Sequence, residues 1–144
     1  MRFKILAVLA LSALALAAPV AAHHSHGNYT DGTIDIEGVV KEVHLVVPHS
    51  YIYVDVTKGS TTDTWALEAT GPGGLLKVGV KVNDLQPGDP VKVRCHLLKD
   101  GSPGCLLGFV TPMHGDAARG HGVEKDWDGG GGAGFPTTSP YTAP

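Results

Sequence analysis

The chain has 144 residues, of which 42% are hydrophobic and 17% charged, and its formal net charge is −3 at pH 7. This length and apolar content suffice for one small domain with a modest core. The acidic balance argues against a nucleic-acid partner, because proteins that bind nucleic acid carry a basic patch or stripe.

Residues 1–22 have the three parts of a secretory signal peptide: a basic start, an apolar run over residues 5–18 and small residues before the cleavage site. We predict cleavage after Ala22, with cleavage after Ala21 as the alternative. A retained anchor is the competing interpretation, but the apolar run is shorter than the roughly 20 residues of a spanning helix. The mature chain is therefore expected to be periplasmic or secreted, without a membrane span. Its formal charge would be −5, since residues 1–22 hold two of the 11 Lys and Arg.

Alternation of apolar and polar residues predicts five strands, because alternate side chains of a strand face the same side. The expected strands are Thr33–Val47, a strand from Pro48 to Val56, Asp63–Ala69, Val91–Leu97 and Cys105–Thr111. In the first strand the apolar parity changes near Gly38, which predicts a bulge or bend. Leu75–Val80 is expected to form one or two helical turns.

Three strands, a short helix and two more strands follow the order of a five-stranded OB-like β-barrel. A small β-sandwich is the alternative, because strand order alone does not establish closure. We predict a His-rich N-terminal segment at 23–32, the OB-like domain at 33–112 and a disordered Gly- and Pro-rich tail at 113–144.

Cys95 and Cys105 are the only cysteines, and they lie on two expected strands joined by a short loop. In an exported protein this arrangement predicts a cross-strand disulfide, which would stabilise the fold by about 2–3 kcal/mol. A copper or redox site that uses both thiolates is the alternative, although the spacing is not Cys-x-x-Cys.

All eight histidines follow the signal peptide, and His23, His24 and His26 open the mature chain. Cleavage after Ala22 would let the amine and imidazole of His23 bind copper together. Cleavage after Ala21 would place His24 third, so that an amine, two amides and its imidazole surround Cu(II) in a square plane. The alternative is a solvated segment that binds metal adventitiously.

His49 is the expected further copper ligand, so the predicted set is His23, His24 and His49, with His26 as an additional candidate. Pro48 cannot donate to a strand ladder and favours a strand start, which would place His49 at the mouth of the barrel. A histidine merely hydrogen-bonded at a strand start is the alternative. Glu68 is expected to be either a partner of a ligand histidine or a solvated strand residue.

The remaining histidines are expected to contribute less. His44 and His96 lie mid-strand among polar neighbours and are predicted at the surface. His114 and His121 fall in the expected tail and would add only loose metal affinity.

Five short motifs follow one another along the chain. They are His23-His24-Ser25, Pro48-His49, Trp65-Ala66-Leu67-Glu68, Pro72-Gly73-Gly74-Leu75-Leu76 and Leu85-Gln86-Pro87-Gly88-Asp89. In this order they resemble a bacterial family of small exported proteins that is a domain of unknown function, over roughly Ala22 to Pro112. The resemblance implies an OB-like barrel in the periplasm and no particular activity. The chain departs from it at Val47, where the family usually has Asn, and at Val80, where it has an aromatic residue.

The sequence is compatible with three functions. The first is a non-catalytic binding protein for copper. The second is an interaction module without metal, whose face around Tyr51 and Tyr53 binds a small ligand or a cell-envelope protein. The third is a copper oxidase, for which no substrate groove or second catalytic constellation is visible. No catalytic triad or nucleotide fingerprint occurs, so a non-catalytic role is favoured over an enzyme, and copper is the candidate cofactor.

Overall fold

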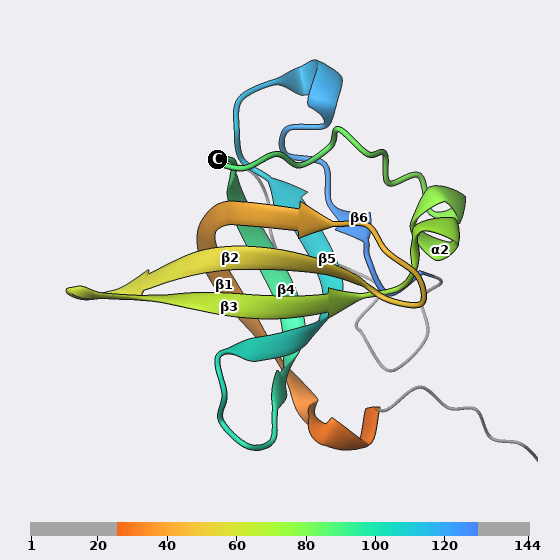
Figure 1. The fold of residues 1–144 in the computed structure, drawn as a ribbon. Coiled ribbons are helices and arrows are strands. Elements are labelled where there is room, and N and C mark those ends of the chain that lie inside the picture. Colours follow the sequence, from red (N-terminus) through yellow and green to blue (C-terminus); the bar gives the residue numbers. More distant parts are fainter. Residues whose placement is uncertain (1–25, 130–144) are drawn as a thin grey trace, which may run out of the picture.

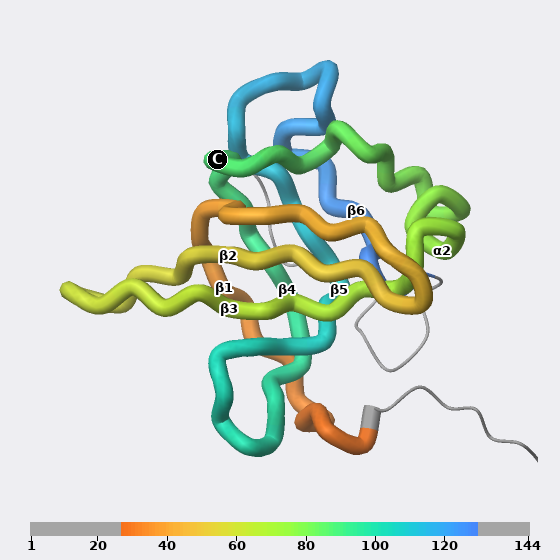
Figure 2. The backbone as a smooth tube through the Cα atoms, in the orientation of Figure 1, coloured from red at the N-terminus to blue at the C-terminus, as the bar shows by residue number. Residues whose placement is uncertain are grey.

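The structure is a computed structural model that describes residues 26–129 (Figures 1 and 2). Over this range the chain is all-β with one short α-helix, as predicted, but it has six strands rather than five. The elements are η1 (His26–Asn28), β1 (Tyr29–His44), β2 (Ser50–Lys58), β3 (Thr61–Ala69), α2 (Pro72–Lys77), β4 (Pro90–Leu98), β5 (Gly104–Pro112), η2 (Ala117–Arg119) and β6 (Lys125–Asp126). No helix in the described range is long and apolar enough to cross a membrane.

The strands form one sheet in the order β3-β2-β1-β4-β5-β6, and neighbours in this order are antiparallel. A parallel pairing of β3 with β5 closes the sheet into a ring, with Leu67 opposite Cys105 and Glu68 opposite Leu106. The long strand β1 is strongly bent (Figure 2), and it pairs with β4 along its first part and with β2 along its second. One strand therefore joins both halves of the sheet.

Gly38 lies where β1 passes from one partner to the other. Val39 pairs with both Pro90 and Asp55, and a register shift follows between Val40 and Glu42. A Cβ atom at Gly38 would lie 2.5 Å from Val54 Cγ1 and 2.6 Å from the carbonyl oxygen of Asp55. A glycine is required here because β2 approaches the backbone too closely for any side chain.

The core lies inside the ring and contains the inward residues of every long strand. Alternate residues of β2, Ile52, Val54 and Val56, are at most 4% exposed, as the alternation predicted. Leu75 of α2 is 2% exposed and joins the same cluster. The helix begins at Pro72, earlier than the predicted Leu75, because proline suits the first helical turn, where its missing N–H is not needed.

The segment after β5 corrects the predicted domain boundary at residue 112. It forms η2 and β6, and Trp127 is 3% exposed within the core cluster. The backbone N–H of Trp127 donates to Gly108 at 2.7 Å, so the segment is fastened to β5. The sequence periodicity did not predict that this segment is folded. The segment is anchored by one large aromatic side chain, Trp127, in a Gly-rich stretch that shows no alternation of apolar and polar residues. Residues 130–144 of the predicted tail lie outside the described range.

Candidate functional site

The carboxylate of Glu68 links the start of β1 to the start of β2. Tyr29 donates its hydroxyl to Glu68 Oε2 at 2.6 Å, and His49 Nδ1 lies 2.5 Å from Glu68 Oε1. The side chain of Glu68 is 14% exposed and that of His49 is 24% exposed. Tyr51 lies opposite Glu68 in the β2–β3 register. We call Tyr29, His49, Tyr51 and Glu68 the Glu68 cluster.

The backbone around Pro48 positions His49. Ser50 is the first residue of β2, so His49 stands immediately before the strand, and Ser50 pairs with Ala69 at the end of β3. A side chain at Gly71 would clash with the carbonyl oxygen of Pro48. The turn after β3 is therefore packed directly against the segment that presents His49.

Burial and charge raise the pKa of both tyrosines of the cluster. Burial raises the pKa of Tyr29 far above its usual value, and the hydrogen bond to Glu68 and its charge raise it further. Burial also raises the pKa of Tyr51, followed by the charge of Glu68 and a hydrogen bond with it. The Tyr29 hydroxyl therefore remains the donor in its hydrogen bond to Glu68 well into the alkaline range.

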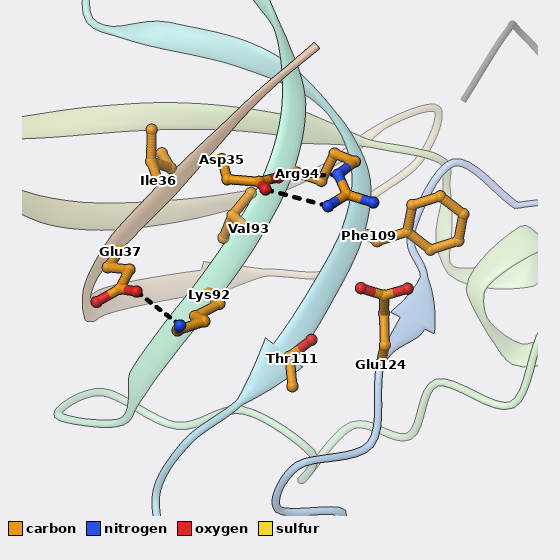
Figure 3. Close-up of a pocket in the computed structure, with 9 residues that line it drawn as sticks. All are labelled: Asp35, Ile36, Glu37, Lys92, Val93, Arg94, Phe109, Thr111 and Glu124. Atoms are coloured by element: carbon orange, nitrogen blue, oxygen red, sulfur yellow. Dashed lines mark hydrogen bonds and ion pairs between the residues drawn. The ribbon is translucent and has the colours of Figure 1, made fainter. Parts of the chain in front are cut away.

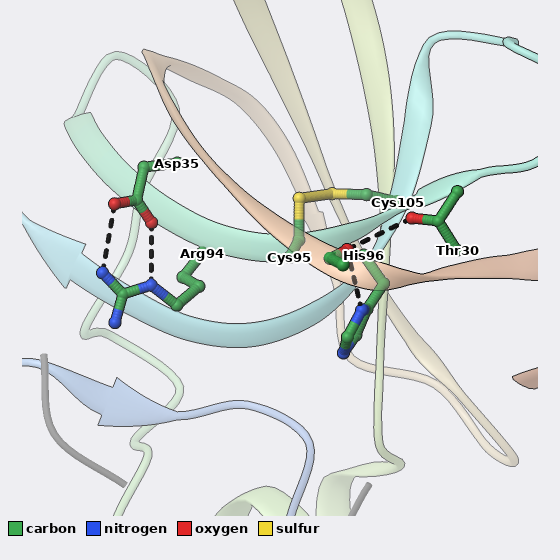
Figure 4. The surroundings of a disulfide bond; sticks show 7 residues. Thr30, Asp35, Arg94, Cys95, His96 and Cys105 are labelled. Atoms are coloured by element: carbon green, nitrogen blue, oxygen red, sulfur yellow. Dashed lines mark hydrogen bonds and ion pairs between the residues drawn. A yellow bond between two sulfur atoms is a disulfide. The ribbon is translucent and has the colours of Figure 1, made fainter. Parts of the chain in front are cut away.

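The cluster continues into a row of residues across the outer face of the ring. Tyr51 faces Glu68, Glu68 faces Leu106, and Leu106 faces His96 on β4. The predicted surface position of His96 is wrong, because this residue is only 5% exposed. Its Nδ1 donates to the carbonyl oxygen of Gly32 at 3.0 Å, and so does the Thr30 hydroxyl at 3.2 Å (Figure 4).

Cys95 and Cys105 form a disulfide beside this row (Figure 4), with their Cα atoms 5.8 Å apart. Both residues are fully buried in the core cluster. The bridge joins β4 and β5 at the position that the spacing of the two cysteines predicted. The alternative of a metal site with two free thiolates is thereby excluded for the oxidised protein.

The structure describes only some of the predicted copper ligands. His23 and His24 lie outside the described residues, and His26 opens η1 three residues before Tyr29. His49 is described, and it contacts Glu68. Within residues 26–129 no group of three His, Cys, Asp or Glu side chains is placed to hold a metal ion.

Sequence reasoning did not identify Tyr29 as a functional residue, and it left Glu68 open between a solvated residue and a histidine partner. The structure places Glu68 beside His49. The sequence did contain one signal for this contact. Glu68 is a charged residue at an outward position of a predicted strand, and the preceding predicted strand begins with Pro48-His49. Nothing in the local pattern around Tyr29 indicated a contact with β3.

The fold and the cluster define an all-β domain with a closed ring of strands and a carboxylate–imidazole pair at one end. The chain belongs to a family of unknown function (DUF6152), whose model matches residues 10–107. The match includes the whole Glu68 cluster and ends within β5, so the segment that carries Trp127 lies beyond it. No curated protein and no solved structure matches the chain.

Proposed function

We propose that this protein is an exported, non-catalytic copper-binding protein of the periplasm, in which His23, His24 and His49 hold the ion. The observation that carries the proposal is the shared carboxylate of Glu68, which contacts both His49 and Tyr29. This contact ties the candidate ligand His49 to β1, the strand that begins within the predicted His-rich segment.

The predicted ligand His24 lies close in sequence to the Glu68 cluster. Two residues after it, His26 begins η1, which leads directly into Tyr29 at the start of β1. The Tyr29 hydroxyl and the His49 ring are separated by a single carboxylate group. Only a short stretch of chain therefore connects the N-terminal histidines to the neighbourhood of His49, which supports a shared site.

The chemistry of His49 suits a metal ligand. With Nδ1 engaged by Glu68, His49 would coordinate through Nε2. A carboxylate on the second ring nitrogen orients a ligand histidine and increases its basicity. The amine and imidazole nitrogens of the processed N-terminus would supply the rest of a nitrogen set, which Cu(II) favours.

The OB-like barrel and the compartment belong to the same proposal. Closure of the ring by β3 and β5, with a short helix between the third and fourth strands, supports an OB-like barrel over a two-sheet sandwich. The buried disulfide supports export to an oxidising compartment.

The test is a Cu(II) titration of the untagged mature protein, purified from the periplasm with its N-terminus verified by intact mass, together with a copper EPR spectrum. We expect one tight equivalent with nitrogen coordination. His49→Ala should weaken the affinity at least about tenfold without loss of the folded circular dichroism spectrum.

His44→Ala is the matched control, since His44 Nε2 also contacts a carboxylate, Glu42, at 2.9 Å. The His44 side chain is 49% exposed and lies at the end of β1. Equal losses in both variants, or weak binding of several copper ions, would contradict the proposed site.

An interaction module is the second candidate, and the tyrosines of β2 favour it. The rings of Tyr51 and Tyr53 stack with centroids 6.5 Å apart, and His44 contacts Tyr53 edge-on at 5.1 Å. Half-buried, paired aromatic rings on an outer sheet face suit contact with a partner. A Tyr53→Ala variant that retains copper but loses a co-purifying cell-envelope protein would support this function.

A further inference from the structure

A pocket of about 230 Å³ lies on the outer face of β1, β4 and β5 (Figure 3). Its apolar wall is the ring of Phe109, because the side chains of Ile36 and Val93, which also border the pocket, belong to the core inside the ring. Its charged lining comes from Asp35, Glu37, Lys92, Arg94 and Glu124. The proposed copper site uses none of these residues.

Arg94 brings a buried, unused hydrogen-bond donor to this pocket. The residue is 7% exposed, and its Nε and Nη2 donate to the carboxylate of Asp35 at 2.8 and 3.0 Å. Nη1 is buried, and no group of the described chain accepts from it. A buried donor without an acceptor costs about 1–3 kcal/mol of folding free energy. We therefore expect a ligand bound in the pocket to supply the acceptor.

Glu124 supplies the opposite charge at the same pocket. In Figure 3 its carboxylate and the Arg94 guanidinium face the same space beside the Phe109 ring. No direct ion pair joins Glu124 to Arg94 in the part of the chain described. The two groups nevertheless interact electrostatically: the hydrogen bond to Asp35 is the main cause that raises the pKa of Arg94, and the charge of Glu124 adds to it.

The charges of the lining select the ligand. Lys92 pairs with Glu37 at 2.8 Å and Arg94 pairs with Asp35. With Glu124, the lining carries one more carboxylate than cation. A simple anion would meet Arg94 but be repelled by Glu124, and a simple cation would leave Arg94 Nη1 without an acceptor. A molecule with both an ammonium and a carboxylate satisfies both groups. The volume is below the roughly 300–1,000 Å³ of pockets for drug-sized ligands, so the molecule must be small.

We propose that this pocket binds a small zwitterion of the free α-amino acid class. Its carboxylate accepts from Arg94 Nη1, its ammonium group donates to the Glu124 carboxylate, and its side chain packs against Phe109. The site is separate from the copper site, so either can exist without the other.

The test is an NMR titration of the isotope-labelled, copper-free mature protein with three probes. L-Leucine carries both charged groups, acetate carries only the carboxylate, and butylamine carries only the ammonium. We expect leucine to cause saturable shifts at Phe109 and the Arg94 side chain, with an affinity at least about tenfold above that of either other probe.

Glu124→Gln removes the negative charge with little change in side-chain size, and it should weaken leucine binding about tenfold. Glu42→Gln makes the same charge change away from the pocket and should leave binding unchanged. No saturation at about 10 mM leucine, equal binding of acetate, or equal effects of the two variants would overturn the proposal.

Discussion

The backbone carbonyl of Trp127 accepts a hydrogen bond of 3.0 Å from the N–H of Thr70, at the point where β3 ends. The buried Trp127 thereby connects the last described segment to the strand that carries Glu68. This contact, with the β5–β6 pairing, makes residues 113–129 part of the folded domain.

Trp127→Ala should therefore lower the free energy of unfolding by about 3–5 kcal/mol, since it removes a large side chain from a packed core. Urea denaturation followed by circular dichroism measures this. Val123→Ala, in the same segment but 53% exposed, should change stability by less than about 0.5 kcal/mol. Similar small effects for both variants would show that the segment is not part of the core.

The ion pair of Asp89 and Arg119 holds the same segment against the turn before β4. Burial acts to raise the pKa of Asp89, but the hydrogen bonds from Arg119 and from the Gln86 backbone outweigh it, so the pKa lies below its usual value. The stabilisation is present above the ordinary carboxyl pKa and is lost as the pH falls through the lowered pKa.

We expect the wild type to lose urea resistance steadily below about pH 4. Asp89→Asn should be less stable at pH 7 by about 1–3 kcal/mol and should depend less on pH in the acid range. A series of urea midpoints against pH measures both. Parallel acid profiles for the two proteins would rule out Asp89 as the group responsible.

We expect ionisation of the Tyr29 hydroxyl to lower the stability of the protein at alkaline pH. Its folded-state pKa is raised, so its stabilisation is complete below the ordinary phenol pKa of about 10 and is lost as the pH rises through the higher folded value. Tyr29→Phe should cost about 1–2 kcal/mol at pH 7, because Glu68 loses a donor.

The same variant should show a shallower decline of stability above about pH 10 than the wild type. Tyr53→Phe is the control, as its hydroxyl makes no contact with Glu68 among the described hydrogen bonds. If both variants lose stability equally at pH 7, the Tyr29–Glu68 bond does not contribute specifically.

Reduction of the Cys95–Cys105 disulfide should lower stability by about 2–3 kcal/mol, mainly because the unfolded chain gains freedom. Urea midpoints of the protein with and without a phosphine reductant measure the change. Copper affinity should not change, since neither sulfur belongs to the proposed site. A copper stoichiometry that rises on reduction would reopen the thiolate alternative.

Local patterns in the sequence were enough to predict much of the scaffold. The alternation of Ile52, Val54 and Val56 identified the buried face of β2, and the place of Pro48 identified His49 as the residue that enters this strand. The spacing of Cys95 and Cys105 predicted their disulfide. Each of these features depends on residues near one another in the chain, where the strand period of two and the rigidity of proline act directly.

The tertiary structure alone decided which polar groups meet. Tyr29 and Glu68 are 39 residues apart and Asp35 and Arg94 are 59 apart, so no local period reports either contact. Closure of the ring by β3 and β5 brings β1, β3 and β4 together, and the burial of Trp127 extends the domain past residue 112. These features arise from packing between distant segments, whose free energy depends on the whole fold rather than on the residues beside each group in the sequence.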